Sequence, residues 1–391
     1  MIVCIDASNI RSGGGLNHLV ELLRAADPRR QGFERVIVGG GSETLSSIED
    51  RDWLEKVAHP WLDRALPFRI LWQRLKLKRL AEHSRSDILF LPGGSDASGF
   101  RPAVAMSQNL LPFEWRELRR YGLSWPAVKQ AILRVTQSRT FRQADGVLFL
   151  TRYAQDRVVE VTGKLRGRTA VVPHGIESRF SFAPRVQRTA QEFTSSNPCR
   201  LLYVSTVDVY KHQWHVAEAT AQLRASGVPV TLDLIGGAYA PALERLSETL
   251  RQLDPAGHFI RYEGPVPHEK LHRVYAAADI GIFASSCETF GQIMLETMSA
   301  GLPLACSRRS AMSEILGEAG VYFDPERPDE IAAAIRGLIE STEQRATRAQ
   351  AGFELARKFS WARCADETFA FLAETCGERG DGEPATRLRD S

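Results

Sequence analysis

The sequence predicts an α/β protein built from two doubly wound parallel sheets. Short apolar runs alternate with helical patterns through the first half of the chain, beginning with IVCID at the N-terminus. The same alternation starts again with RLLYVS at residue 200. Strands that alternate regularly with helices are typical of parallel sheets covered by helices. We therefore expect two domains of this kind in one chain.

The expected strands are short and separated by helical stretches. They are IVCID, RVIVGG, DILFLP, AVAMS, GVLFL and TAVVP in the first half, and RLLYVS, VTLDLIGG, HFIRYEG, DIGIFAS and LPLACS in the second. Residues 176–199 between the halves lack periodicity and contain Pro184, Ser195, Ser196, Asn197 and Pro198, a composition typical of a linker. We predict domains at residues 1–180 and 198–358, followed by a disordered tail at 377–391.

Composition limits the class of protein. The chain has 391 residues, 43% of them hydrophobic, which is enough for two or three ordinary domains with sizeable cores. Its six cysteines lie far apart without a CxxC pattern, so we expect neither a zinc site nor a disulfide framework, and a reducing compartment. Met1 leads directly into a strand, and no apolar run approaches the roughly 20 residues that cross a bilayer. The expected location is the cytoplasm.

Charge is distributed unevenly along the chain. Residues 1–180 hold 28 Lys and Arg against 19 Asp and Glu, whereas the remainder holds 22 against 28. One basic stretch, residues 68–80, places Trp72, Leu75 and Leu77 beside Arg74, Lys76, Lys78 and Arg79, and a second stretch runs from 116 to 142. Such a surface can rest on anionic lipid, with solvated helix faces as the alternative. We expect peripheral contact with the inner face of the cytoplasmic membrane and no nucleic-acid partner.

The sequence CETFGQIMLETMSAGLP, residues 287–303, carries the strongest functional pattern. The apolar run at 280–284 predicts a buried strand, and residues 285–289 have the composition of a turn before a helix. Backbone amides of Phe290, Gly291 and Gln292 would then be unpaired at the helix N-terminus. Unpaired amides and the helix dipole favour a diphosphate there, and glycine allows a ligand to approach the backbone.

Two glutamates flank this predicted helix start. Glu288 precedes the helix, and Glu296 lies inside it on the face shared with Gln292. A carboxylate on that face can accept two hydrogen bonds from a ribose diol. By spacing alone, two solvated glutamates on a surface helix are the alternative reading.

Glu288-x7-Glu296 followed by Ala300-Gly301-Leu302-Pro303 resembles the donor site of retaining GT4 glycosyltransferases with the GT-B fold. The joint match to FG at the helix start and AGLP at its end favours this family over the surface helix. The resemblance covers nearly the whole chain and is strongest from 200 to 325. It implies two facing Rossmann-like domains, with a last helix near 359–375 that crosses back to pack on the N-terminal domain.

The resemblance also implies roles for single residues. Glu288, with Thr289 beside it, would hold the donor sugar, Phe290 to Gln292 the diphosphate, and Glu296 the ribose. Lys211 falls on the family lysine that neutralises the leaving diphosphate. The position of the accompanying family arginine is occupied by Thr206, so one expected cation is missing.

Candidate residues in the first half follow two of the expected strands. Gly13, Gly14 and Gly15 open the helix after the first strand, without the spacing of a dinucleotide fingerprint. The resemblance implies a loop that touches the donor phosphate and the acceptor, whereas a flexible turn is the alternative. Asn109 stands where many relatives carry a catalytic histidine near the reacting sugar, and it offers an amide without charge.

The remaining candidates depend largely on position. Gly236 ends the strand VTLDLI, and Val266 lies in a segment whose backbone borders the nucleotide base in the family. His174 matches the family segment that leads into the linker, with an ordinary turn residue as the alternative. Asp50-Arg51-Asp52 is formally a DxD pattern, but it lies in a charged, helix-like segment and is expected to be a solvated face. We therefore expect no metal and no other cofactor, since cations and helix dipoles can stabilise the leaving group.

Together these patterns predict a retaining, metal-independent glycosyltransferase whose leaving phosphate helps to deprotonate the acceptor. The segments at 6–24 and 107–122 are most similar to bacterial transferases that build O-antigen or other surface polysaccharides, several of which use GDP-mannose or a GDP-deoxyhexose. The expected acceptor is a growing lipid-linked or surface glycan. A sugar-nucleotide epimerase of the same fold and a catalytically silent scaffold are the alternatives.

Overall fold

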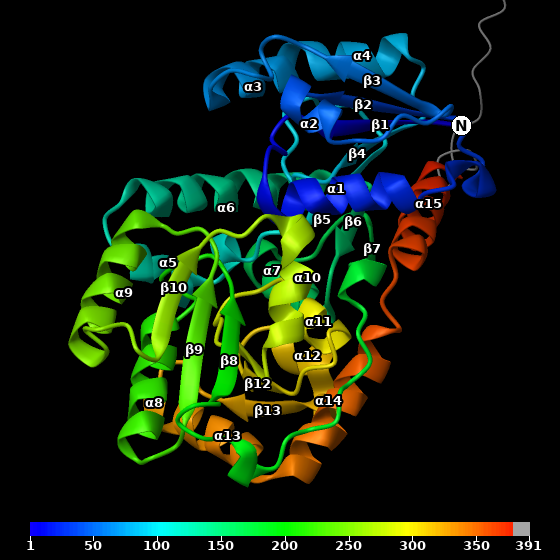
Figure 1. The fold of residues 1–391 in the computed structure, drawn as a ribbon. Helices are drawn as coiled ribbons and strands as arrows, with labels where there is room; N and C mark the ends of the chain where they lie inside the picture. The colour runs from blue at the N-terminus through cyan, green and yellow to red at the C-terminus, as the bar shows by residue number, and fades with distance from the viewer. Residues whose placement is uncertain (378–391) are drawn as a thin grey trace, which may run out of the picture. The chain divides into compact units, whose positions relative to one another are not determined.

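The computed structural model describes residues 1–377, which form two compact units (Figure 1). Of the described residues, unit 1 comprises Met1–Asn109, Lys129–Gly175 and residues 361–377. Unit 2 comprises Leu110–Val128 and Ile176–Ser360. The sequence-based division at residues 1–180 and 198–358 did not assign 110–128 to the second unit. The expected disordered tail lies outside the described residues, apart from its first residue, Gly377, which ends the last helix.

Unit 1 contains a seven-stranded parallel sheet in the order β3-β2-β1-β4-β5-β6-β7. Its strands are β1 Ile2–Ala7, β2 Arg35–Gly40, β3 Leu54–Ala58, β4 Ile88–Leu91, β5 Ala103–Ser107, β6 Gly146–Phe149 and β7 Arg168–Val171. Strands β4, β5 and β6 are buried along their whole length, and β2 is buried except for Arg35, as expected for a sheet covered on both faces. The strand order reverses between β1 and β4, where ligands of doubly wound folds commonly bind.

The helices of unit 1 include the predicted crossing helix. They are α1 Gly13–Ala25, η1 Pro28–Gln31, α2 Ser42–Ser46, α3 Leu66–Trp72, the π-helical η2 Gln73–Leu77, α4 Lys78–His83, most of α6 Trp125–Gln143, α7 Arg152–Thr162 and α15 Trp361–Gly377. Helices α1 and α15 lie side by side (Figure 1). Leu19 and Leu22 of α1 and Phe369 and Leu372 of α15 are buried. The prediction that the last helix packs on the N-terminal domain is therefore confirmed.

Unit 2 contains a six-stranded parallel sheet in the order β10-β9-β8-β11-β12-β13. Its strands are β8 Cys199–Val204, β9 Val230–Ile235, β10 Ile260–Gly264, β11 Ile280–Phe283, β12 Leu304–Ser307 and β13 Gly320–Phe323. The order reverses between β8 and β11, which pair through Leu201 with Ile280 and through Leu202 with Gly281. This reversal defines the topological switch point of unit 2.

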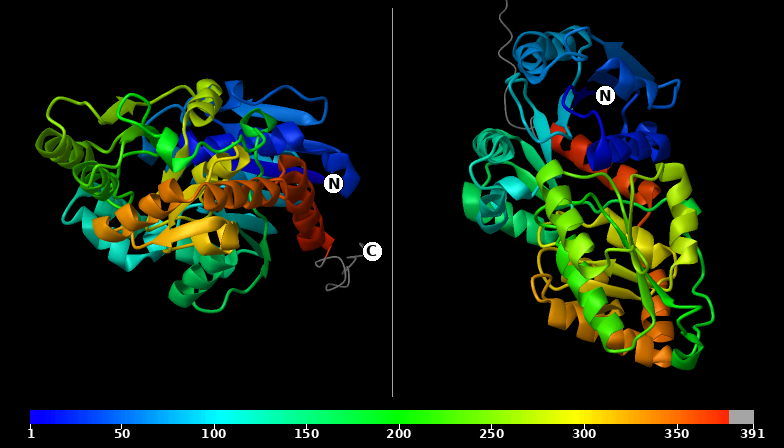
Figure 2. Two further views of the ribbon diagram at one scale, coloured as in Figure 1. Left: turned by 60° about the horizontal axis from the view of Figure 1, so that its bottom comes forward. Right: turned by 60° about the vertical axis from the view of Figure 1, so that its left-hand side comes forward.

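Helices flank the sheet of unit 2, as both views of Figure 2 show. They are η3 Leu111–Phe113, α5 Trp115–Leu118, η4 Arg119–Tyr121, η5 Ser178–Phe180, η6 Ala190–Glu192, α8 Gln213–Ala225, α9 Ala240–Leu253, α10 His268–Ala277, α11 Gln292–Ser299, α12 Met312–Leu316, η7 Gly317–Ala319, α13 Pro328–Glu340 and α14 Thr342–Ala356. The two sheets and their helices confirm the predicted α/β architecture.

The segment Leu110–Val128 is held in unit 2 by polar contacts. The Tyr121 hydroxyl donates to Asp208 at 2.8 Å, and Ser286 donates to Glu117 at 2.6 Å. Arg120 pairs with Glu326 at 2.7 Å, and Arg309 also pairs with Glu326. Partial burial opposes ionisation of Glu326, but these two arginines lower its pKa to about 2. A helical segment from the first half of the chain is thus fixed to the second sheet by ion pairs.

Several local expectations were wrong. The Asp50–Asp52 stretch is a loop that leads into β3, and Asp50 and Asp52 pair with Lys56 and Arg29. Trp72 and Leu77, two of the three apolar residues expected on the basic surface, are buried in the core, whereas Leu75 is exposed together with Phe68, Ile70 and Leu71 of the same stretch. Within residues 1–377, none of the helices combines the length and apolar character needed to span a bilayer.

Candidate functional site

The candidate residues of unit 2 follow the carboxyl ends of four neighbouring parallel strands. Val266 comes after β10, Gly236 after β9, Lys211 after β8 and Glu288 after β11. Strands β8 and β11 are the pair at which the strand order reverses. Because ligands of open α/β sheets bind beyond the carboxyl ends at such a reversal, the topology places the candidates where a ligand is expected.

Lys211 and Glu288 form an ion pair across this switch point. Only 9% of the Lys211 side chain and 17% of the Glu288 side chain are exposed. The lysine ammonium also lies over the ring of Phe283, 5.5 Å from its centroid, at the end of β11. A donor that binds to both side chains has to replace this pair with its own charges and hydroxyls.

Hydrogen bonds fix the backbone on either side of the pair. The Tyr203 hydroxyl donates to the Lys211 carbonyl at 2.7 Å. The Glu288 amide donates to the Ser310 hydroxyl at 2.9 Å, and that hydroxyl donates to the Glu288 carbonyl at 2.8 Å. Sequence reasoning missed Ser310, because it is 22 residues from Glu288 and carries no pattern of its own.

Helix α11 begins at Gln292, with Gly291 as its N-terminal cap. Gly291 has φ +92°, a conformation that side-chain-bearing residues rarely adopt, so glycine is required at this position. The helix carries Glu296 into the interior, where only 3% of the residue is exposed. The predicted helix start and the position of Glu296 inside the helix agree with the structure.

Two residues of α10 hold the Glu296 carboxylate. The Tyr275 hydroxyl donates to Glu296 Oε2 at 2.9 Å, and His268 Nε2 lies 3.7 Å from Oε1. Burial and the neighbouring carboxylate both raise the pKa of Tyr275, so the phenol stays protonated and remains a donor. A carboxylate accepts about four hydrogen bonds, which leaves acceptor capacity for a ligand diol.

His268 lies between charges of both signs. The carboxylate of Glu296 raises the pKa of His268, whereas burial and Arg179 oppose the increase. Arg179 Nη2 lies 2.6 Å from His268 Nδ1, and Glu177 lies 3.7 Å from the same atom. Neither Tyr275 nor His268 was predicted, since only the packing of α10 against α11 brings them to Glu296.

Gly236 and its neighbours form a tight turn at the end of β9. A side-chain carbon at Gly236 would lie 2.2 Å from the carbonyl oxygen of Ser205, so only glycine fits. The Gly236 carbonyl accepts from the Tyr262 hydroxyl at 2.8 Å. Val266 packs on the apolar cluster of this unit, and Thr206 is exposed, with its carbonyl bound to the side chain of Gln213.

The candidates of the first half all belong to unit 1. Gly13, Gly14 and Gly15 are the first turn of α1 and not a loop before it. A side-chain carbon at Gly13 or Gly14 would meet no atom within 4 Å, so there is open space beside this backbone. Asn109 follows β5 and donates to the side chain of Gln130 at 3.2 Å.

His174 is part of a buried aromatic cluster in unit 1. Its Nδ1 lies 2.9 Å from Nδ1 of His18, and both rings pack against Trp361. Burial lowers the pKa of both histidines, so both remain neutral. The turn-residue alternative for His174 is therefore wrong, and the side chain belongs to the core.

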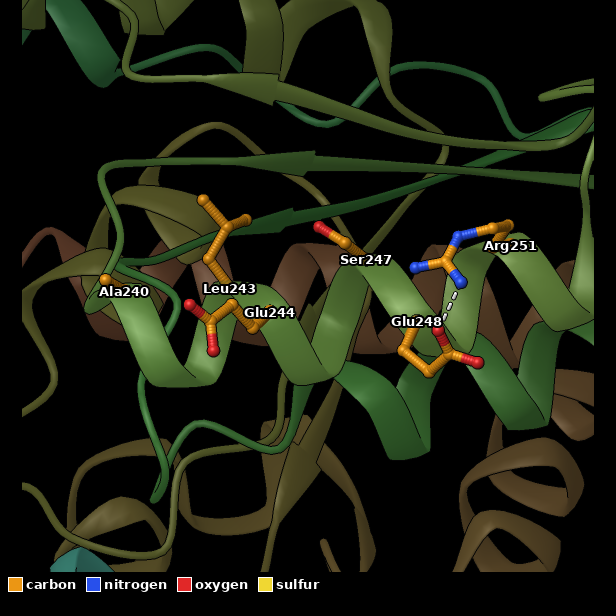
Figure 3. A pocket seen from close by; sticks show the side chains of 6 residues that line it. All are labelled: Ala240, Leu243, Glu244, Ser247, Glu248 and Arg251. Carbon is orange, nitrogen blue, oxygen red and sulfur yellow. Dashed lines mark ion pairs between the residues drawn. The ribbon is translucent and has the colours of Figure 1, made fainter.

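A shallow pocket on the outer face of α9 contains none of the predicted site residues. Figure 3 shows its lining side chains along one helix, including an ion pair between Glu248 and Arg251. All six lining residues belong to residues 240–251. Among residues 1–377, no cluster of three or more His, Cys, Asp or Glu side chains could hold a metal ion.

Comparisons with known proteins identify the class. The family described as "Glycosyltransferase Family 4" matches residues 12–180, and "Glycosyl transferases group 1" matches residues 198–341. Both halves of the chain thus match glycosyltransferase family models, and the chain has the GT-B fold.

Individual relatives are more distant. The chain is 29% identical over 222 residues to "O-antigen chain mannosyltransferase B" of Escherichia coli, covering 57% of this chain and 56% of the relative. It is also 29% identical over 253 residues to the "GDP-mannose-dependent alpha-(1-6)-phosphatidylinositol dimannoside mannosyltransferase" of Mycobacterium tuberculosis, covering 62% and 63%. The matches thus span little more than half the length of these curated relatives. The crystal structure of Anabaena Alr3699/HepE in complex with UDP and glucose has the same fold, with a TM-score of 0.70 at 18% identity, covering 96% of this chain and 100% of that one.

Proposed function

We propose that this protein is a retaining, metal-independent glycosyltransferase that moves a hexose or deoxyhexose from a nucleotide sugar to a growing glycan. A GDP-mannose or GDP-deoxyhexose donor and a lipid-linked or surface-polysaccharide acceptor are favoured. Support for the donor comes from the two relatives above, both named as mannosyltransferases and one as GDP-mannose-dependent.

The observation that carries the proposal is the placement of Lys211, Glu288 and Glu296 around the β8–β11 switch point. Glu288 holds hydroxyls of the donor sugar, and Lys211 neutralises the diphosphate as it leaves. Glu296, oriented by Tyr275, binds the ribose. Each group thus acts on a different part of one nucleotide sugar.

In the proposed reaction, the bond from the anomeric carbon to the diphosphate breaks, and a bond to the acceptor oxygen forms on the same face of the sugar. The leaving diphosphate accepts the acceptor's proton, so no protein base is needed. Lys211 stabilises the negative charge that develops on the diphosphate.

The proposed acceptor also motivates a membrane contact. In the basic stretch after α3, Arg74, Lys78 and Arg79 are exposed and Lys76 is partly exposed. Each such cation near an anionic surface contributes about 1 kcal/mol. Replacing these four residues with glutamate should reduce co-sedimentation with anionic vesicles. Equal binding by the wild type and the variant would show that this stretch does not contact the membrane.

The test of the reaction is nucleotide release from GDP-mannose, a GDP-deoxyhexose and UDP-glucose, with and without a lipid-linked glycan and with and without a chelator. Acceptor-dependent release and a product of retained anomeric configuration are expected. Donor isomerisation without acceptor would indicate an epimerase, and absence of nucleotide binding would indicate a silent scaffold. Activity that the chelator abolishes would overturn metal independence.

A further inference from the structure

The first two-thirds of α6 presents an uncovered apolar stripe. Trp125, Val128, Ile132 and Val135 recur at intervals of three and four residues, which places them on one helix face. They are 71%, 49%, 54% and 68% exposed, and Leu123 just before the helix is fully exposed. The buried residues of α6 begin only at Gln137. Among residues 1–377, these apolar side chains of α6 therefore remain largely uncovered.

The charged residues of α6 all have the same sign. Helix α6 contains Lys129, Arg134, Arg139 and Arg142 and no carboxylate. Arg139 continues the stripe by one more turn, and Lys129 flanks it. If two copies of this helix paired about a two-fold axis, their cations would repel one another. An anionic lipid surface is a better partner, because it offers negative headgroups to the cations and an apolar interior to the stripe.

We propose that α6 is a lipid-binding helix that lies in the plane of an anionic bilayer surface. The stripe enters the boundary between headgroups and acyl chains, with Trp125 at the interface and the cations among the phosphates. This surface is separate from the basic stretch at 68–80. Lipid binding by α6 would determine where the protein is located and not which sugar it transfers. Lipid binding needs neither donor nor acceptor, so its failure is separable from failure of the proposed reaction.

The first experiment measures co-sedimentation of the full chain with vesicles of phosphatidylcholine, alone or with about one-third phosphatidylglycerol. Binding is expected only to the anionic vesicles. Trp125→Gln with Ile132→Gln should abolish it, because glutamine keeps the helix but removes the apolar contact. Val186→Gln, at an apolar residue 97% exposed outside the helix, is the matched control and should bind normally.

A second pair of variants tests the charges. Lys129→Gln with Arg139→Gln should weaken partitioning about 30-fold, which corresponds to about fivefold for each cation. Lys164→Gln with Arg166→Gln removes two exposed cations elsewhere in unit 1 and should have little effect. An equal loss of vesicle binding in both double variants would mean that only the total charge of the protein matters and would overturn the assignment to α6.

A third readout locates the contact itself. Lipids brominated on their acyl chains should quench tryptophan fluorescence of the bound protein, and Trp125→Phe should bind normally but lose most of the quenching. Quenching unchanged in that variant would place another surface against the lipid. A dimer seen by light scattering and dissociated by Trp125→Gln with Ile132→Gln would show that the stripe is a protein interface and would refute the proposal.

Discussion

Replacing Lys211 with methionine should separate the structural role of the Lys211–Glu288 ion pair from its role in catalysis. Methionine keeps the unbranched side chain up to the position of Cε but leaves the Glu288 carboxylate, 17% exposed, without its cation. Removing one partner of a buried ion pair costs about 3–5 kcal/mol, and the remaining exposure of Glu288 places the loss near the lower end. Lys211→Met together with Glu288→Gln removes both charges and should recover most of that loss.

Urea unfolding of the wild type, the two single variants and the double variant measures the interaction free energy between the side chains. Turnover should fall at least about 100-fold in Lys211→Met and stay low in the double variant, because the cation that stabilises the leaving diphosphate is absent from both. A double variant as unstable as Lys211→Met would refute the ion-pair reasoning. Near-normal turnover in Lys211→Met would show that the lysine does not face the leaving group.

Two further predictions concern pH. The pKa of Glu326 is lowered to about 2 in the folded protein. Its ion pairs therefore stabilise the folded protein at pH values above the unfolded-state pKa of this carboxyl, near 4.5, and this stabilisation is lost as the pH falls toward 2. Glu326→Gln should cost on the order of 2–3 kcal/mol at pH 7 and progressively less below pH 4.5, measured by denaturant unfolding; a cost independent of pH would contradict this. Glu296 raises the pKa of His268 in the folded protein. The contact between His268 and Glu296 therefore stabilises the folded protein at pH values below the unfolded-state pKa of histidine, near 6.5, and this stabilisation is lost as the pH rises through the higher folded-state pKa. His268→Gln should therefore lower Tm more at pH 6 than at pH 8.5, and an equal decrease in Tm at both pH values would refute the pairing.

Much of the fold could be predicted because the central strands are continuous apolar runs. The edge strand β3 was missed, because it contains Glu55 and Lys56, is only partly buried and has no apolar run. The short β13 was missed as well, since Val321 and Tyr322 are partly buried in a strand of four residues. The grouping of 110–128 with unit 2 depends on ion pairs between residues about 200 positions apart, which leave no periodic signal.

The candidate site was predicted only as far as local sequence determines it. The turn at Gly291, the helix start and the place of Glu296 follow from residues within one short segment. The ion pair of Lys211 with Glu288 joins positions 77 residues apart, and the contact of Tyr275 with Glu296 joins two helices. Such contacts arise from the strand order of the folded sheet, so the sequence indicates which residue types are present but not which side chains touch.

The central claim, that Glu288 and Glu296 bind different parts of one nucleotide sugar, is tested most directly by comparing Glu296→Ala and Glu288→Ala. Binding of GDP alone is measured by calorimetry, beside steady-state kinetics over a donor titration. Glu296→Ala should bind GDP poorly and raise KM with little change in kcat, since ribose contacts are shared by ground and transition states. Glu288→Ala should bind GDP almost normally and lower kcat, because the sugar develops charge only as the bond breaks. The reverse pattern would contradict the assigned roles, and normal behaviour of both variants would exclude a donor site at these residues.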